Sequence, residues 1–268
     1  MRILKRYEKA DSRFKVFLRP NIQPKGANAC RNFGFEKSQG NYINWFDSDD
    51  LMRPTFLQSK VEKHSEDNFD FVLSKTIISD LGSNKYLHEL RTRLSPNLLE
   101  DFLTRNITWY LPDPMFRRSF LAGKELFDEN LLGGQDRDFF RRILLVNPKI
   151  AVLDDYSRVY ILHRDSISES IYRKQTPEVL ISIFIAQVKF INTLKKRKLL
   201  SKKLKKFYFK ELMKFAPFLY KSPVLLNILN NTLTQLQMMD FYILKLWFKY
   251  CIGLTSLKIT GKGQKLFK

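Results

Sequence analysis

The stretch NYINWFDSDDLMRP, residues 41–54, contains the pattern on which the interpretation of the chain rests. Tyr42–Phe46 is aromatic and apolar and predicts a strand, and three carboxylates follow it directly: Asp47, Asp49 and Asp50. Open α/β sheets bind ligands at the C-terminal edge of their strands, where this cluster is expected. Crowded carboxylates repel one another unless a cation joins them, and oxygen ligands suit hard divalent ions that bridge to phosphate. A solvated turn, or an aspartate capping the helix that follows, is the alternative.

The residues on both sides of this stretch alternate between strand and helix patterns up to about residue 163. Such alternation predicts an α/β fold with a layered sheet. From Thr176 onward, apolar residues recur at helical spacing with lysines between them, which predicts a helical region. The helices predicted before that point are Met1–Lys9, Ala27–Ser38, Pro54–His64, Ser95–Leu103 and Gln135–Leu145, with loop and short helix at Asp113–Gly123, and the strands are Phe14–Pro20, Tyr42–Phe46, Phe69–Ile78 and Ile150–Leu162.

The net charge of +20 is distributed very unevenly along the 268 residues. Residues 189–268 hold 18 Lys and Arg against two acidic residues, whereas the first 188 residues hold 29 basic and 25 acidic side chains. A nearly neutral body therefore carries a strongly basic helical tail. Such asymmetry indicates an anionic surface nearby, either nucleic acid or membrane headgroups. No helix-turn-helix or zinc-binding pattern supports the nucleic-acid alternative.

Cysteine content and apolar runs indicate the cellular compartment of the protein. Cys30 and Cys251 are far apart and in no metal or redox spacing, so a disulfide framework is not indicated and a reducing cytoplasm is expected. The most lipid-like run, Phe241–Leu254, is too short to span a bilayer and contains Lys245 and Lys249. We therefore expect no transmembrane helix.

The segment from Pro24 to Pro54 resembles the nucleotide-sugar signature of family 2 glycosyltransferases, which have the GT-A fold. The family pattern has a glycine, Ala-Arg-Asn on a helix, another glycine, an aromatic strand and Asp-x-Asp-Asp. In this chain Cys30 interrupts the Ala-Arg step. The matching residues are Gly26, Ala29, Arg31, Asn32, Gly40, Tyr42–Phe46 and Asp47-Ser48-Asp49-Asp50.

The resemblance implies a fold and a set of roles. It implies a GT-A-like mixed sheet flanked by helices over residues 1–170, followed by a basic, mainly helical region over 171–268. Asp47 and Asp49 would hold Mg²⁺ or Mn²⁺ against the donor diphosphate, with Asp50 supporting the metal or the sugar. Gly26 and Arg31 would contact the nucleotide-sugar. By spacing alone, Arg31 would instead form a surface ion pair.

Two downstream segments extend the resemblance. In LLGGQDRDFFRRILL, residues 131–145, Gln135 replaces the family's usual Glu, and Asp136 would be the general base that activates the acceptor in an inverting displacement. Alternatively, Asp136 caps the helix, and Asp138 is a second candidate. In VYILHRDSIS, residues 159–168, His163 would lie near the metal, or be structural. The loop Trp109–Pro114 would face the acceptor, with Trp109 stacking on a sugar or lying in the core.

The resemblance does not include the family's first strand, helix and second strand, because this chain begins in what resembles the following helix. Either the true start lies upstream or the chain is a truncated form, and we expect weak or absent catalysis by residues 1–268 alone. The predicted function is transfer from a nucleotide-diphosphate sugar to a lipid-linked or polysaccharide acceptor. It would take place in the cytoplasm, at the inner face of an anionic membrane bound by the basic helices. The alternatives are an inactive GT-A-like scaffold and a basic protein that binds membranes or nucleic acid.

Overall fold

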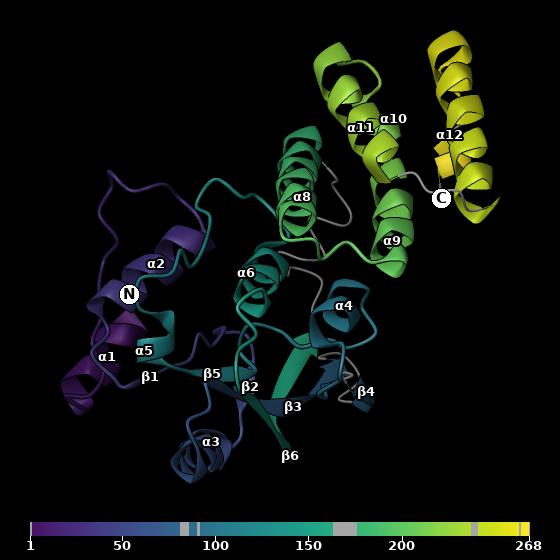
Figure 1. Ribbon diagram of the computed structural model, residues 1–268. Coiled ribbons are helices and arrows are strands. Elements are labelled where there is room, and N and C mark those ends of the chain that lie inside the picture. Colours follow the sequence, from purple (N-terminus) through teal and green to yellow (C-terminus); the bar gives the residue numbers. More distant parts are fainter. Residues whose placement is uncertain are drawn as a thin grey trace.

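The structure of the chain is a computed structural model that describes residues 2–80, 86–89, 92–162, 176–236, 241–262 and 264–267. Its N-terminal part is built on a mixed sheet, and its C-terminal part is a group of helices stacked beside that sheet (Figure 1). The predicted mixed sheet flanked by helices is therefore confirmed. The predicted domain boundary near residue 170 lies outside the described residues.

The sheet has the strand order β1-β5-β3-β6-β2, with β4 paired to β3. Among the described strands, β3 and β6 pair in parallel and the other neighbours are antiparallel. The long β3 and β6 are rich in β-branched and aromatic residues and form the centre, where both faces can be covered. The strands are β1 (Tyr42–Ile43), β2 (Leu51–Met52), β3 (Phe71–Asp80), β4 (Tyr86–Glu89), β5 (Pro114–Arg117) and β6 (Ile150–Leu162).

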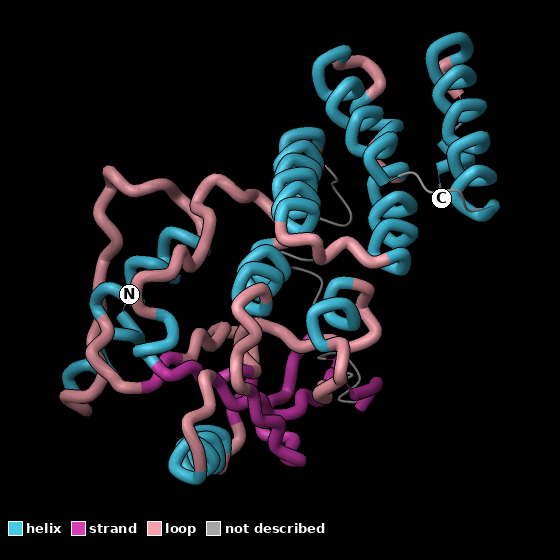
Figure 2. The backbone as a smooth tube through the Cα atoms, viewed as in Figure 1, coloured by secondary structure: helices cyan, strands magenta, loops and turns pink. Residues whose placement is uncertain are grey.

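Helices lie on both faces of the sheet, as Figure 2 shows with helices in cyan and strands in magenta. On one face α3 packs against β3 and β6. On the other, Phe139, Phe140 and Ile143 of α6 join aromatic residues of the sheet in a buried core. This core is rich in aromatic residues, and Phe71, Phe116 and their neighbours form a network of ring contacts in it. The helices of this part are α1 (Arg2–Ala10), α2 (Ala27–Lys37), α3 (Phe56–Glu66), α4 (Leu98–Leu103), α5 (Arg118–Leu121) and α6 (Gln135–Leu144).

The C-terminal helices form a second core of their own, which also takes in Leu103 from α4. Phe184, Phe209, Leu229 and Ile243 are among its fully buried members. Because the two cores meet at α4 and α6, the helical region packs directly against the sheet-containing part. Its helices are α8 (Pro177–Lys196), α9 (Lys202–Met213), α10 (Ala216–Leu219), α11 (Pro223–Leu236), α12 (Phe241–Thr260) and the short η1 (Gln264–Phe267).

Some predicted elements are wrong or displaced. Residues 14–20 form no strand, and Phe14, Phe17 and Leu18 are exposed, because an apolar run becomes a strand only where a neighbouring strand receives its hydrogen bonds. Ser95 does not cap α4, which begins at Leu98 after Asn97. Residues 113–123 contain strand β5, which was expected to be loop, as well as the short helix α5.

One helix among the described residues is long and apolar enough to cross a membrane, and it is α8 rather than the run Phe241–Leu254 that the sequence singled out. Length and composition are the whole of that criterion, and core helices of soluble proteins also meet it. Phe184, Phe190 and Leu194 of α8 are buried in the second core.

Candidate active site

The acidic cluster forms a tight turn between β1 and β2. The backbone N–H of Asp50 donates to the carbonyl of Asp47 at 3.3 Å, which closes the turn. Asp47 and Asp49 point toward solvent, whereas Asp50 is buried. None of the three caps α3, whose N-cap residue is Thr55. The turn therefore presents two accessible carboxylates and turns the third inward.

Arg31 brings the two predicted halves of the site together. It donates from Nη2 to Oδ1 of Asp47 and from Nη1 to Oδ1 of Asp136, both at 3.4 Å. Its guanidinium also lies over the ring of Phe127, 5.5 Å from the ring centre. Only 16% of the Arg31 side chain is exposed, so this is a partly buried bridge rather than a surface ion pair. Carboxylates from two distant segments of the sequence thus meet at one cation.

Gly26 starts the helix that carries Arg31. Its φ of 141° is a conformation that residues with a Cβ rarely adopt, which explains a glycine at the N-cap of α2. No side chain caps this helix end, so its first backbone N–H groups donate to no capping side chain. Gly26 therefore sets the direction from which α2 delivers Arg31 to the acidic turn.

Asp136 lies in the first turn of α6, and its side chain is 34% exposed. The N-cap residue of α6 is Gly134, so Asp136 is not the cap. Burial raises the pKa of Asp136 above its ordinary value; the positive charge of Arg31 opposes this effect and the negative charge of Asp47 adds to it. A carboxylate with a raised pKa is a better proton acceptor near neutral pH than an ordinary one. Asp138, the second candidate, is buried against Arg141 and Arg142.

A buried ion-pair network supports the turn from below. Arg158 of β6 contacts Asp50 and Asp113 at 2.6 Å each, and all three side chains are at most 1% exposed. The backbone N–H of Tyr110 also donates to Asp113 at 2.6 Å. Asp50 is therefore held by Arg158, and Asp113 is a buried partner of the same arginine.

Sequence reasoning missed Arg158, although a charged residue inside an otherwise apolar and β-branched strand was a visible signal. It also missed Tyr160, which lies beside this network with its ring 5.3 Å from that of Tyr110. Burial raises the pKa of Tyr160, and the charges of Asp50, Asp49 and Asp47 raise it further while Arg158 lowers it. The tyrosine is therefore close enough to all three acidic side chains for their charges to affect its pKa.

Of the remaining predicted site residues, one lies in the core and one lies outside the described residues. Trp109 is buried and packs on Phe102 and Phe140, so of its two expected roles the structure shows the core one. His163 lies outside the described residues. Beside Arg31 and Asp47, a cleft of about 370 Å³ opens between α2 and the segment around Trp45.

The donor set of the turn suits a divalent ion that binds mainly through its substrate. Within the described ranges, no group of three or more His, Cys, Asp or Glu side chains forms a complete metal cage. Mg²⁺ is commonly held by one or two carboxylates plus substrate phosphates and water. Asp47 and Asp49, both accessible on one turn, fit that arrangement.

The comparisons with known proteins agree with this architecture. The sequence model of the family described as "Glycosyl transferase family 2" matches residues 2–130. The uncharacterized glycosyltransferase EpsJ of Bacillus subtilis is 25% identical over 194 residues, which cover 69% of this chain and 56% of EpsJ. The cholesterol galactosyltransferase of Borreliella burgdorferi is 25% identical over 184 residues, which cover 64% of this chain and 51% of that protein. The chain thus spans little more than half the length of these relatives.

The crystal structure of S. aureus TarS 1–349 in complex with UDP-GlcNAc matches 98% of this chain and 80% of that one, with a TM-score of 0.50 and 15% sequence identity. At this identity the likeness shows the fold, which is of the GT-A type. The fold and the sequence relatives agree in their likeness to glycosyltransferases. The match of residues 2–130 to the model of glycosyltransferase family 2 confirms the resemblance found in the sequence.

Proposed function

We propose that this chain carries the reaction centre of an inverting, metal-assisted transferase that uses a nucleotide-diphosphate sugar. The observation behind the proposal is the contact of Arg31 with both Asp47 and Asp136, at 3.4 Å each. It joins the acidic turn to the start of α6, so that a donor held at the turn has Asp136 beside it. An acceptor hydroxyl can approach at this junction.

Each residue has a distinct role in the proposal. Asp47 and Asp49 hold Mg²⁺ or Mn²⁺, with His163 as a further candidate ligand. The ion would stabilise the negative charge that develops on the departing nucleoside diphosphate. Arg31 adds positive charge at the same place and orients Asp47. Asp50 fixes the turn through Arg158 and does not itself reach the donor.

Asp136 accepts the proton of the acceptor hydroxyl as its oxygen attacks the anomeric carbon. One direct displacement on the face opposite the leaving diphosphate inverts the configuration at that carbon. The raised pKa of Asp136, caused first by burial, favours this proton transfer.

Binding and turnover measurements separate this function from an inactive scaffold. Calorimetric titration with UDP and Mn²⁺ should show metal-dependent binding that Asp47→Asn abolishes and Asp136→Asn retains. Whatever turnover of donor sugar the wild-type chain shows should fall about 10²–10⁴-fold in Asp136→Asn. Asp154→Asn, at an exposed carboxylate on β6, is the matched control. Absence of metal-dependent UDP binding by the wild-type chain would favour the inactive scaffold, and full turnover by Asp136→Asn would exclude Asp136 as the base.

The acceptor in this proposal is lipid-linked or a polysaccharide, met at the inner face of an anionic membrane. The name of the cholesterol galactosyltransferase relative indicates a lipid acceptor for that protein. In this chain, Leu244, Phe248 and Ile252 recur every four residues on the exposed side of α12, and Lys245 and Lys249 flank them. An apolar stripe with lysines beside it is typical of helices at anionic interfaces.

Vesicle co-sedimentation tests the membrane step. Vesicles containing phosphatidylglycerol should bind the chain more than phosphatidylcholine vesicles do. The double variant Leu244→Ser, Phe248→Ser should lose most of this binding, while Val224→Ser, at an exposed apolar residue of α11, should keep it. Binding that is indifferent to anionic lipid would contradict the proposal. Binding to duplex DNA that outcompetes vesicles would favour the nucleic-acid alternative.

A further inference from the structure

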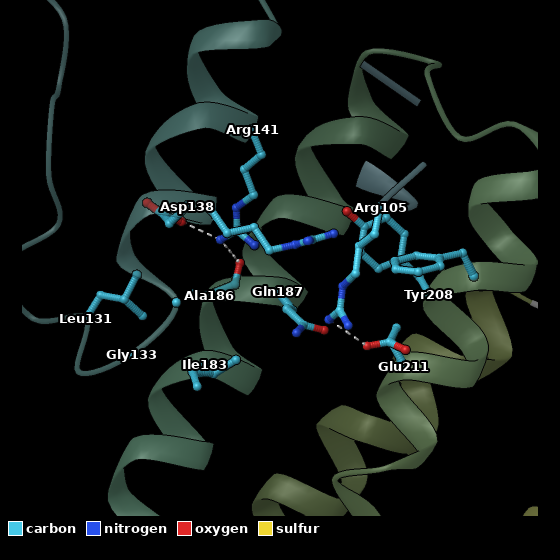
Figure 3. Close-up of a pocket in the computed structure, with 13 residues that line it drawn as sticks. Arg105, Leu131, Gly133, Asp138, Arg141, Ile183, Ala186, Gln187, Tyr208 and Glu211 are labelled. Atoms are coloured by element: carbon cyan, nitrogen blue, oxygen red, sulfur yellow. Dashed lines mark hydrogen bonds and ion pairs between the residues drawn. The ribbon is translucent and has the colours of Figure 1, made fainter. Parts of the chain in front are cut away.

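A small cavity lies where the sheet-containing part meets the C-terminal helices. It has a volume of about 40 Å³ and is lined by residues of α6, α8 and α9, the loop before α6, and Arg105 (Figure 3). That volume corresponds to roughly three water molecules. Its polar lining is unusual because three of its seven polar residues are arginines. The polar lining residues are Arg105, Arg137, Asp138, Arg141, Gln187, Tyr208 and Glu211.

The two carboxylates at the cavity are already shared between basic partners. Asp138 accepts from both Arg141 and Arg142. Glu211 pairs with Arg105 at 3.3 Å and also with Lys214. Four cations thus divide two negative charges before Arg137 is counted. Over these contacts the cluster therefore carries more positive than negative charge.

Arg137 is the cation without an acidic partner. Its Nη2 donates to the backbone carbonyl of Leu103, and no ion pair to Arg137 is found among the described residues. Burial lowers its pKa to about 10, and the positive charge of Arg105 contributes to the same effect. The guanidinium is still protonated at neutral pH. An unbalanced buried charge is unfavourable, and a bound anion would relieve it.

Further donors face the same space. Nε of Arg141 is buried without a hydrogen-bond partner, and the residue as a whole is only 7% exposed. The side-chain oxygen of Gln187 is also without a partner, and a half-turn of the amide would aim its NH₂ group there instead. The N-terminus of α6, which has no side-chain cap, begins at Gly134 in the lining. Positive backbone ends of helices favour anions.

We propose that this cavity, which we call the arginine pocket, binds a small inorganic anion, chloride or phosphate. Arg137 and Arg141 would supply the charge and the buried N–H groups, and the cavity is too small for a sugar. The anion would lie beside Arg137, the residue that follows Asp136 in α6. It would hold α6 against α8 and α9. The proposal concerns a site separate from the donor cleft and does not depend on the proposed reaction.

Thermal unfolding of the full chain in different sodium salts tests the arginine pocket. At equal ionic strength, chloride or phosphate should raise the melting temperature relative to gluconate, which is too large to enter. A ligand at ten times its dissociation constant should give a rise of about 2–5 °C. Comparison of the chloride and phosphate series identifies which anion the pocket prefers.

Arg137→Gln should abolish this salt-specific rise, whatever its effect on the melting temperature in gluconate. Arg197→Gln is the matched control, because Arg197 also donates to a backbone carbonyl across the junction, that of Leu145, but lies outside the cavity. Equal melting temperatures of the wild type in all three salts would overturn the proposal. A rise that persists in Arg137→Gln would also overturn it.

Discussion

Arg158→Met is the substitution whose effect the structure defines most sharply. Methionine keeps much of the arginine's apolar volume but removes the cation between Asp50 and Asp113. Both carboxylates lie 2.6 Å from Arg158 and are almost completely buried. After the substitution, Asp113 keeps the N–H of Tyr110 at 2.6 Å and the hydroxyl of Thr76, whereas among the described residues Asp50 keeps the N–H of Ile161 at 3.4 Å. Two buried charges would thus lose their shared counter-ion.

Removal of one partner from a buried ion pair costs about 3–5 kcal/mol. Because two carboxylates lose the same partner, we expect the free energy of unfolding to fall by about 5 kcal/mol. For a chain of this size, that corresponds to a melting temperature about 10–20 °C lower. Urea unfolding and calorimetry measure both quantities. Metal-dependent UDP binding should weaken as well, because Asp50 no longer anchors the acidic turn.

The control is the triple variant Asp50→Asn, Asp113→Asn, Arg158→Met, which removes the charges together. It should recover a large part of the lost stability, since neutral amides are cheaper to bury than unpaired carboxylates. A loss below about 1 kcal/mol in Arg158→Met alone would refute the reasoning. It would mean that the network is hydrated or that Arg158 faces solvent.

Three further substitutions test other parts of the structure. Arg31→Gln removes the positive charge that lowers the pKa of Asp136, so the acidic limb of the kcat/KM profile should move to higher pH; an unchanged limb would contradict the assignment of the base. Lys60→Met should raise stability at pH 7 by about 1–3 kcal/mol, because Nζ of Lys60 is buried without a hydrogen-bond partner. Burial lowers the pKa of Lys60 well below its ordinary 10.5. Between the lowered pKa and 10.5 the unfolded chain binds more protons than the folded one, so wild-type stability should rise with pH across that range, and Lys60→Met should flatten that rise in denaturation curves. Gly133→Ala would place a Cβ 3.0 Å from Ile183 and Val179 of α8, so unfolding should show a loss of about 1–2 kcal/mol, and no loss would mean that α8 moves aside freely.

The sequence predicted the long elements well because their patterns are strong over many residues. Strand β6 has the predicted bounds, Ile150–Leu162, and α6 begins at the predicted Gln135 and ends one residue before the predicted Leu145. The strands β2 and β5 have only two and four residues, and pairing with a neighbour determines them more than their own propensity does. Residues 14–20 show the converse, since their β-prone composition found no partner strand.

The candidate site was predictable only as far as its local motifs reached. The acidic turn, Arg31 and Asp136 each belong to a short pattern. That Arg31 joins the other two depends on how α2 and α6 pack, which no spacing reveals. Arg158 has an unusual place in an apolar strand, but its partner Asp50 lies 108 residues away in the sequence. The sequence shows the unusual charge in β6 but does not identify its ion-pair partner.

The opposite directions of the neighbouring carboxylates explain how the acidic turn can be both charged and well ordered. A loop with three repelling carboxylates would otherwise be open and variable. Asp50 is neutralised from inside by Arg158, whose own position is fixed by β6 and by the rings of Tyr110 and Tyr160. That contact anchors the last residue of the turn to the centre of the sheet and leaves Asp47 and Asp49 facing outward. Preorganised carboxylates lose less conformational entropy when a cation binds, so the inward ion pair would favour the metal binding that we propose for the outward pair.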